Sequence, residues 1–242
     1  MPKLQPGLRI YAIGDIHGQI DLVEQMVALI ARDLRDRPPR GPSIEIFLGD
    51  YIDRGAHSSS VIELLARGAP SCDQRICLRG NHEELLLGFL EDPAQLDLWW
   101  SNGGAATAMS YGLSSSLRKS VRNAPLLVHE RIAQLIPADH QEFLRKLGYS
   151  YRAGDYLFVH AGVRPGISID KQYREDLVWI REPFLSSRED FGVRIVHGHT
   201  PVEAPDVRPN RINIDTGAFM TGRLTCLVLE GEKTGFIQAR AQ

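Results

Sequence analysis

The chain has 242 residues, of which 43% are hydrophobic and 24% charged, so it is long enough to bury a sizeable core in one large domain or two small ones. Its formal net charge of -2 gives no long-range attraction to nucleic acid or to an anionic membrane, and we expect neither as a partner. No stretch approaches the roughly 18 apolar residues of a membrane span, and the first residues lack the apolar core of a signal peptide, so we expect a cytoplasmic protein.

The 3 cysteines form no Cys-x-x-Cys pair, which predicts reduced thiols rather than disulfides or a zinc site. The sequence does not indicate an oligomeric state.

Two apolar segments near the N-terminus are each followed by a polar loop and then by a helix. Residues 9–13 and 44–48 predict strands, and the second of these is apolar enough to be buried. Residues 20–34 repeat apolar side chains at helical spacing, and 58–67 predict a helix that a run of serines can cap. The two loops read Gly14-Asp15-Ile16-His17-Gly18 and Gly49-Asp50-Tyr51-Ile52-Asp53-Arg54-Gly55.

A third predicted strand, residues 75–78, leads into a third polar loop and then into an apolar helix over 85–90. From about 93 to 147 the sequence is mostly helical, and we expect a helical insertion that covers the site. Trp99 and Trp100, within it, are more typical of packing than of ligand binding. The polar loop is Arg79-Gly80-Asn81-His82-Glu83-Glu84, and the insertion contains Asn102-Gly103-Gly104.

Strands return in the C-terminal part of the chain. They are predicted over residues 149–152, 155–159, 193–196, 211–214, 224–229 and 236–239, the last two as a hairpin. Three of them end in His160-Ala161-Gly162, His197-Gly198-His199-Thr200 and Asp215-Thr216-Gly217. Because ligands gather at the carboxyl ends of strands in open α/β sheets, we expect all six polar loops to converge.

The convergent loops contain side chains that bind metal ions. The candidate ligands are Asp15, His17, Asp50, Asn81, His160 and His199. Carboxylate, imidazole and amide groups together suit divalent transition metals such as manganese, iron or zinc. Six ligands exceed what one ion with open positions needs, so we predict two ions that share Asp50.

In the order and spacing of these motifs, the sequence resembles the metal-dependent phosphoprotein phosphatases, within the calcineurin-like metallophosphoesterases. The short chain and the segments Asn102-Gly103-Gly104, Trp179-Ile180-Arg181-Glu182 and Asp215-Thr216-Gly217-Ala218 resemble the bacterial and phage protein-serine/threonine phosphatases in particular. The resemblance implies one metallophosphoesterase domain over residues 1–242, with an α/β fold. This fold is a four-layer αββα sandwich of two mixed β-sheets flanked by helices, with the helical insertion at about 93–147.

The resemblance also implies a role for each site residue. Asp15 and His17 hold one metal ion, Asp50 bridges, and Asn81, His160 and His199 hold the other. Arg54, Arg79 and Arg181 grip the phosphate oxygens, His82 protonates the leaving group, and Asp53 orients His82. Two divalent ions about 3.5 to 4 Å apart, with manganese expected first and iron or zinc as alternatives, can activate a shared water for in-line attack on phosphorus. No nucleophilic side chain is then required.

Several residues near the motifs have a structural interpretation. His57, His129 and His140 lie outside the motifs and are interpreted as surface or helix histidines. His197 lies two residues from His199, but the resemblance places the ligand at the histidine before Thr200, so we interpret His197 as packing or as a neighbour of a ligand. Asp215 is expected to fix a loop or a ligating histidine rather than to bind metal.

Two other functions remain open. The first is a bis(5'-nucleosyl)-tetraphosphatase or another small-molecule phosphoesterase with the same metal core, although the second motif of that group usually departs from the Asp-x-x-Asp-Arg-Gly form present here. The second is an inactive phospho-binding scaffold. Such a protein should lack at least one of the six metal-ligand residues, and all six are present. The expected partner is therefore a phosphorylated protein or peptide substrate. The sequence does not distinguish phosphoserine or phosphothreonine from phosphotyrosine or phosphohistidine.

Overall fold

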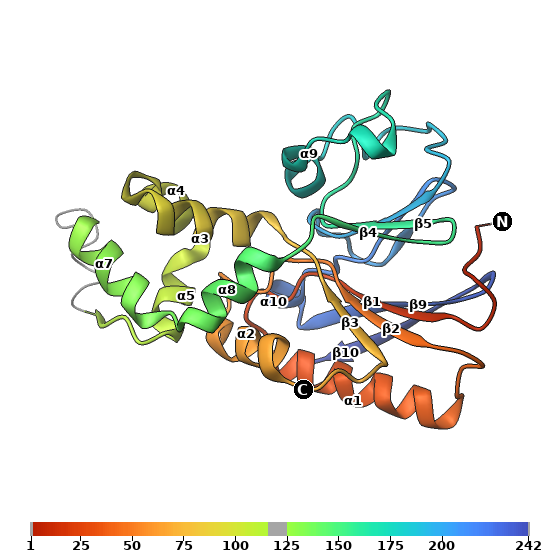
Figure 1. Ribbon diagram of the computed structural model, residues 1–242, viewed down its shortest axis with the longest axis horizontal. Helices are drawn as coiled ribbons and strands as arrows, with labels where there is room; N and C mark the ends of the chain where they lie inside the picture. Colours follow the sequence, from red (N-terminus) through yellow and green to blue (C-terminus); the bar gives the residue numbers. More distant parts are fainter. Residues whose placement is uncertain (1, 116–124, 242) are drawn as a thin grey trace.

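The strands form two mixed sheets that face each other, as seen in a computed structural model that describes residues 2–115 and 125–241 (Figure 1). The first sheet has the order β10-β9-β1-β2-β3 and the second the order β4-β5-β6-β8-β7. The first sheet contains β1 (Arg9–Ile13), β2 (Ser43–Phe47), β3 (Gln74–Cys77), β9 (Arg223–Glu230) and β10 (Lys233–Arg240). The second contains β4 (Ser150–Ala153), β5 (Tyr156–Val159), β6 (Arg194–His197), β7 (Asp206–Val207) and β8 (Arg211–Asn213).

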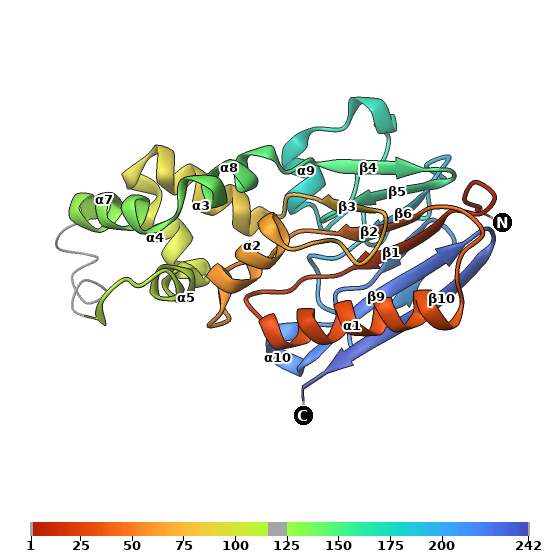
Figure 2. The ribbon, with the colours of Figure 1, turned by 60° about the horizontal axis from the view of Figure 1, so that its bottom comes forward.

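The first sheet is buried on both faces where β1 and β2 run parallel. Every residue of these two strands is buried, as expected for parallel strands that are covered on both sides. One apolar cluster fills the space between the two sheets and includes Ile10, Ile46 and Phe158. A second cluster packs the other face of the first sheet against helices, and Figure 2 shows α1 (Ile20–Asp36) lying along β9 and β10. The sandwich of two mixed sheets with flanking helices is the fold that the sequence predicts.

The helices after β2 and β3 continue directly from the polar loops. They are α2 (Ser58–Arg67) and α3 (Asn81–Glu91), with α9 (Arg174–Trp179) and α10 (Ala218–Thr221) in the C-terminal part. The sequence predicts the helix after β3 only from residue 85, but α3 begins at Asn81. Its first turn is held by Glu83, whose carboxylate accepts from the backbone N–H of Gly80 at 2.9 Å. Asn81 and His82 are therefore fixed in a helix rather than placed on a loop.

The described part of residues 93–147 is helical and extends away from the sheets (Figure 1). It contains η1 (Pro93–Gln95), α4 (Leu96–Trp99), η2 (Trp100–Gly104), α5 (Ala105–Ser110), α7 (Pro125–Leu135) and α8 (Ala138–Lys146). Residues 116–124 of the predicted insertion lie outside the described residues. Among the described helices, none is both long and apolar enough to cross a membrane.

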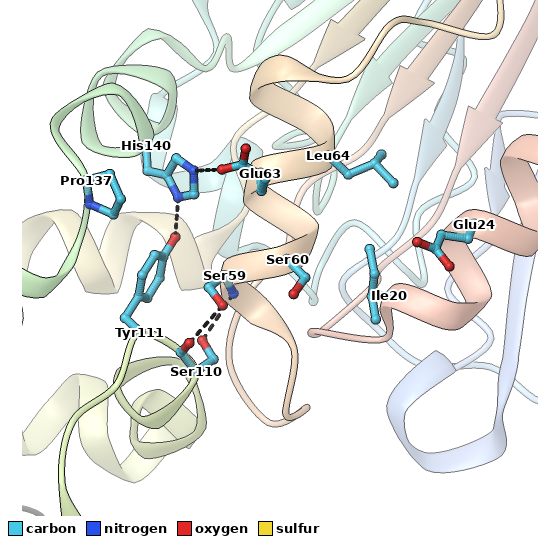
Figure 3. Close-up of a pocket in the computed structure, with 10 residues that line it drawn as sticks. All are labelled: Ile20, Glu24, Ser59, Ser60, Glu63, Leu64, Ser110, Tyr111, Pro137 and His140. Atoms are coloured by element: carbon cyan, nitrogen blue, oxygen red, sulfur yellow. Dashed lines mark hydrogen bonds and ion pairs between the residues drawn. The ribbon is translucent and has the colours of Figure 1, made fainter.

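Polar contacts attach the insertion to α2 around a pocket of about 550 Å³ (Figure 3). The hydroxyl of Tyr111 lies 2.9 Å from Nδ1 of His140, and Nε2 of His140 lies 2.8 Å from Oε2 of Glu63. His140 is thus a helix histidine, as predicted, but it is buried rather than exposed, because it connects α8 to α2. Below it, Ser59 of α2 bonds to Ser110 of α5.

Candidate active site

Polar loops from both sheets meet at one place. The loops after β1 and β2 carry Asp15, His17 and Asp50, and the first turn of α3, after β3, carries Asn81 and His82. The loops after β5, β6 and β8 carry His160, His199 and Asp215. The predicted convergence therefore spans two facing sheets, because these six strands are divided between them. All eight side chains are buried.

The backbone of these loops is strained at the site itself. Among the described residues, the non-glycine residues with left-handed φ are His17 (47°), Asp50 (54°), Asp53 (69°), Arg54 (65°) and His199 (66°). Such a conformation is costly for a residue with a Cβ and concentrates at functional sites. No motif in the sequence reveals it, since the same residues could follow a strand with ordinary dihedrals.

Asp50 is shared by two groups of metal-ligand side chains. One group contains His17, Asp50 and His82, and the other contains Asp50, His160 and His199, with the ligand atoms of each group within 4.8 Å of one another. Nε2 of His17 lies 3.4 Å from Oδ2 of Asp50, whereas Nε2 of His160 lies 3.4 Å from Oδ1. Each oxygen of Asp50 therefore faces a different group, which suits a carboxylate that bridges two ions.

Asn81 joins the second group. Its Oδ1 lies 3.0 Å from Nε2 of His160 and 2.9 Å from Nδ1 of His199. Asp15 belongs to neither group, and its carboxylate accepts from the backbone N–H of His199 at 3.1 and 3.2 Å. A Cβ on Gly198 would lie 2.0 Å from Oδ1 of Asp15, so only glycine allows this approach.

The charges of the site suit bound cations. Asp15, Asp50 and Asp215 are all buried, and burial together with their mutual repulsion raises the pKa of Asp15 well above its usual value. Burial also raises the pKa of Asp50, and raises that of Asp215 to about 6. Divalent cations would offset this cluster of negative charge.

The imidazoles are in the form that binds metal. Burial lowers the pKa of His17 and of His160 well below the usual range, and lowers that of His199 to about 3. Nδ1 of His17 is 2.8 Å from the carbonyl of Ile52, and Nδ1 of His160 is 3.0 Å from that of Leu48. These bonds orient the rings so that Nε2 faces Asp50, as in many metal-ligating histidines. The residues therefore fit a centre of divalent ions.

His82 differs from these histidines. Its Nδ1 lies 2.8 Å from Oδ2 of Asp53, and its Nε2 lies 3.9 Å from Oδ2 of Asp50. Burial alone would lower the pKa of His82, but the carboxylates of Asp50 and Asp53 outweigh it and raise that pKa. The contact with Asp53 agrees with the predicted acid pair, whereas the proximity to His17 and Asp50 also leaves His82 within reach of a metal ion.

The three predicted phosphate-binding arginines are placed differently. Arg54 lies at the centre, with NH1 3.1 Å from Nε2 of His17 and NH2 3.0 Å from Nε2 of His82. Arg181 is exposed, and its charge adds to burial in lowering the pKa of His199, so it lies near that member of the second group.

The structure does not direct Arg79 to the site. Its NH1 donates to Glu84 and to the hydroxyl of Tyr149, and its NH2 donates to the carbonyls of Leu144 and Arg145 at the end of α8. Both terminal nitrogens are thus engaged away from the metal ligands.

Two further placements concern His197 and Asp215. Nδ1 of His197 is 3.1 Å from the carbonyl of Gly198, and its ring packs against Phe184 at 5.0 Å between centroids. It does not belong to either metal-ligand group. Asp215 accepts from the backbone N–H of Gly217 at 2.9 Å, so it holds its own loop.

Four side chains contribute to the site although the sequence analysis gave them no role there, including Trp99, which it interpreted as packing. The carboxylate of Glu83 accepts from the backbone N–H of Asp50 at 2.9 Å and from that of Tyr51 at 2.8 Å, and its spacing from Gly80 is the capping signal that could have identified it. The ring of Phe219 contacts that of His17 at 5.2 Å and lies 4.9 Å below the guanidinium of Arg54. Trp99 and Thr107 bond to Asp53, and no sequence signal indicates this.

Comparisons with known proteins show the family and the fold of this chain. Residues 8–219 match the family model of the calcineurin-like phosphoesterases. The chain is 25% identical over 239 residues to the asymmetrical bis(5'-nucleosyl)-tetraphosphatase PrpE of Bacillus velezensis, with 88% of this chain and 86% of the relative covered. It is 26% identical over 225 residues to serine/threonine-protein phosphatase 1 of Salmonella typhimurium, with 89% of each chain covered. The crystal structure of a candidate diadenosine tetraphosphatase covers 100% of both chains with a TM-score of 0.66 and 21% identity, and so supports the fold.

Proposed function

The chain belongs to the calcineurin-like phosphoesterases, and from this membership and the site geometry we propose that it is a two-metal phosphohydrolase that transfers a phosphoryl group to water. One observation carries the proposal. Asp50 presents one oxygen to each of two ligand groups, with Arg54 beside His17 and His82 of the first group. We propose manganese as the metal, with His17, Asp50 and Asp15 at the first position and Asp50, Asn81, His160 and His199 at the second. Divalent ions bound there would lower the pKa of a water and stabilise the charge that develops on phosphorus.

The residues around the metal positions would bind and orient the phosphoryl group. Arg54 spans His17 and His82 with two separate nitrogens, and a guanidinium can present such a pair to two phosphate oxygens. The stacking of Arg54 on Phe219 limits the motion of its side chain. Arg181 is exposed and its charge acts on His199 of the second group, so we assign it a third phosphate oxygen.

His82 would protonate the leaving group. Nδ1 of His82 faces Asp53, and Nε2 faces a terminal nitrogen of Arg54. We place the phosphoryl group beside that nitrogen. When Arg54 bonds to phosphate instead of His82, Nε2 of His82 is free to hold the proton that the leaving group receives. General acid catalysis matters most for a basic leaving group such as a serine alkoxide.

Two substrate classes follow from different observations. The acid pair of His82 and Asp53 favours a phosphomonoester of an alcohol, and hence a phosphoserine or phosphothreonine protein. The groove of about 520 Å³ beside Arg54 supports the same class, because Ala56, Gly103, Ala105, Ala106, Met109 and Ser110 line the rest of it and none of these six carries a charge for a polyphosphate.

The names of the relatives favour the second class. The Bacillus velezensis relative, which aligns over most of the chain, is a dinucleoside tetraphosphatase, so the form of the second motif is a weaker argument against this activity than the sequence suggested. We therefore keep bis(5'-nucleosyl)-tetraphosphate hydrolysis as the second candidate, on the same metal site.

One experiment tests the proposal and separates the candidates. Phosphate release from phosphoserine peptides and nucleotide release from diadenosine tetraphosphate are measured side by side with added manganese, with Asp50→Asn as a matched control. Turnover of the peptide in preference to the tetraphosphate, lost in the variant, is the expected result. The reverse preference would establish the second candidate, and turnover of neither substrate would refute the proposal.

A further inference from the structure

Asp53 is the point where the helical insertion meets the catalytic loops. It is fully buried, with 0% of its surface exposed. Side chains from three helices donate to its carboxylate: His82 of α3 to Oδ2 at 2.8 Å, Thr107 of α5 to Oδ1 at 2.6 Å, and Trp99 of α4 to Oδ1 and Oδ2 at 3.1 and 3.2 Å. Donors in three directions define the plane of the carboxylate.

Thr107 also holds the backbone of Asp53. The backbone N–H of Asp53 donates to Oγ1 of Thr107 at 2.8 Å and to Oγ of Ser58 at 3.1 Å. A hydroxyl can accept one hydrogen bond while donating another, so Thr107 bonds to both ends of the same residue. This matters because Asp53 has a left-handed φ of 69°, which its neighbours must maintain.

The indole of Trp99 is itself fixed. Its ring stacks on Phe89 at 4.8 Å between centroids and 20° between planes. A Cβ on Gly104 would lie 2.4 Å from this ring, so the glycine lets the indole lie flat against the backbone of the next turn. The only polar atom of the indole is then directed at Asp53.

The same turn of the insertion contacts the phosphate-binding arginine. The backbone N–H of Arg54 donates to the carbonyl of Gly103 at 3.3 Å. Gly103 has a φ of 106°, and a Cβ there would lie 2.9 Å from the backbone nitrogen and from Cγ of Arg54. The segment from Trp99 to Thr107 therefore contacts both Asp53 and Arg54.

We propose that Trp99 and Thr107 are positioning residues for catalysis, which fix the carboxylate of Asp53 so that Oδ2 holds Nδ1 of His82 and Nε2 faces the leaving group. This inference deepens the proposed function and rests on it. It assigns the insertion a part in the chemistry, in addition to the predicted role of covering the site. The competing interpretation is that Trp99 and Thr107 only pack the core, in which case their polar atoms do not affect protonation of the leaving group.

Conservative variants separate these interpretations. Trp99→Phe keeps the stacking ring and removes the N–H, and Trp100→Phe is the matched control, because the indole of Trp100 touches that of Trp99 but, among the described residues, has no hydrogen bond to Asp53. Thr107→Val removes the hydroxyl at nearly constant volume, and Thr107→Ser restores it.

The readout is how each variant depends on the leaving group. General acid catalysis is worth about 10² to 10⁴ in rate, so partial loss of positioning in Trp99→Phe or Thr107→Val should slow kcat on a phosphoserine peptide by about 10-fold or more. We expect a loss below about 3-fold on nitrophenyl phosphate, whose leaving group needs little protonation. Thr107→Ser should recover most of the peptide rate, and Trp100→Phe should retain it. Equal slowing of both substrates, or equal effects of Trp99→Phe and Trp100→Phe, would overturn the proposal.

A second measurement does not depend on turnover. The Nδ1–H proton of His82, bonded to a buried carboxylate, is expected to give a downfield proton NMR signal in the metal-free protein, assigned by its absence in His82→Asn. Trp99→Phe and Thr107→Val should shift or broaden this signal, whereas Trp100→Phe should not. An unchanged signal in the first two variants would overturn the positioning role. If the wild-type protein hydrolyses neither phosphate ester, the proposed function fails, and the NMR result still decides whether these residues fix the acid pair.

Discussion

Replacing His197 and His199 one at a time tests the assignment of the second metal position. The two histidines are two residues apart, both are buried, and burial lowers the pKa of both to about 3. Only His199 belongs to the group with Asp50 and His160, while the ring of His197 packs on Phe184. His199→Ala should therefore lose metal, and His197→Ala should lose stability.

The magnitudes follow from these surroundings. Removing a residue that hydrogen-bonds to a metal ligand typically lowers metal affinity about 10- to 100-fold. Removing the ligand itself in His199→Ala should therefore lower the affinity of the second position at least about 100-fold. His197→Ala leaves a cavity against Phe184, and truncation of a buried ring of this size costs about 2 to 4 kcal/mol. At about 2 to 4 °C per kcal/mol for a chain of this length, Tm should fall by on the order of 10 °C.

Two assays give opposite results for the two variants. Elemental analysis over a manganese titration should show the second ion lost in His199→Ala and retained in His197→Ala. Thermal unfolding in EDTA should show the larger loss of Tm in His197→Ala. His57→Ala, at an exposed position, is the control for both. Equal loss of metal in the two variants would refute the assignment of the ligand to His199.

Three further predictions concern the same centre. Asp50→Asn should weaken both metal ions together, because its two oxygens face different groups, and an elemental analysis that shows one ion bound normally would contradict the bridge. His82→Asn should retain both ions and slow a phosphoserine peptide by about 10² to 10⁴, more than an aryl phosphate, and loss of metal in this variant would make His82 a ligand instead. Asp215→Asn tests a carboxyl group whose pKa burial raises to about 6, so that its ionisation destabilises the fold as pH rises through that value. In EDTA the variant should gain about 1 kcal/mol relative to the wild type between about pH 5 and pH 8, measured by denaturant unfolding, and a constant difference would exclude this effect.

Much of the fold could be predicted because the signals are local. The strand over 9–13 and the helix over 58–67 have the predicted bounds, since apolar spacing depends on neighbouring residues. The predicted serine cap is wrong, because His57 is the N-cap of this helix and its side chain makes no capping hydrogen bond. The two short elements β7 and α10 were not predicted, because two or four residues carry no periodic pattern. Helix α3 starts earlier than its apolar run because Glu83 caps its first turn at the N–H of Gly80 and ties that turn to the N–H groups of Asp50 and Tyr51.

The sequence by itself determined which residues could bind metal, since the polar motifs follow six strands and their side chains limit the chemistry. Only the tertiary structure decided how these side chains are used. Arg79 turns to Tyr149, 70 residues away, and His140 is buried against Glu63, 77 residues away. Trp99 reaches Asp53 across 46 residues, and Thr107 reaches it across 54. Such contacts depend on how sheets and helices pack, and local propensity contains no information about partners so distant in the chain.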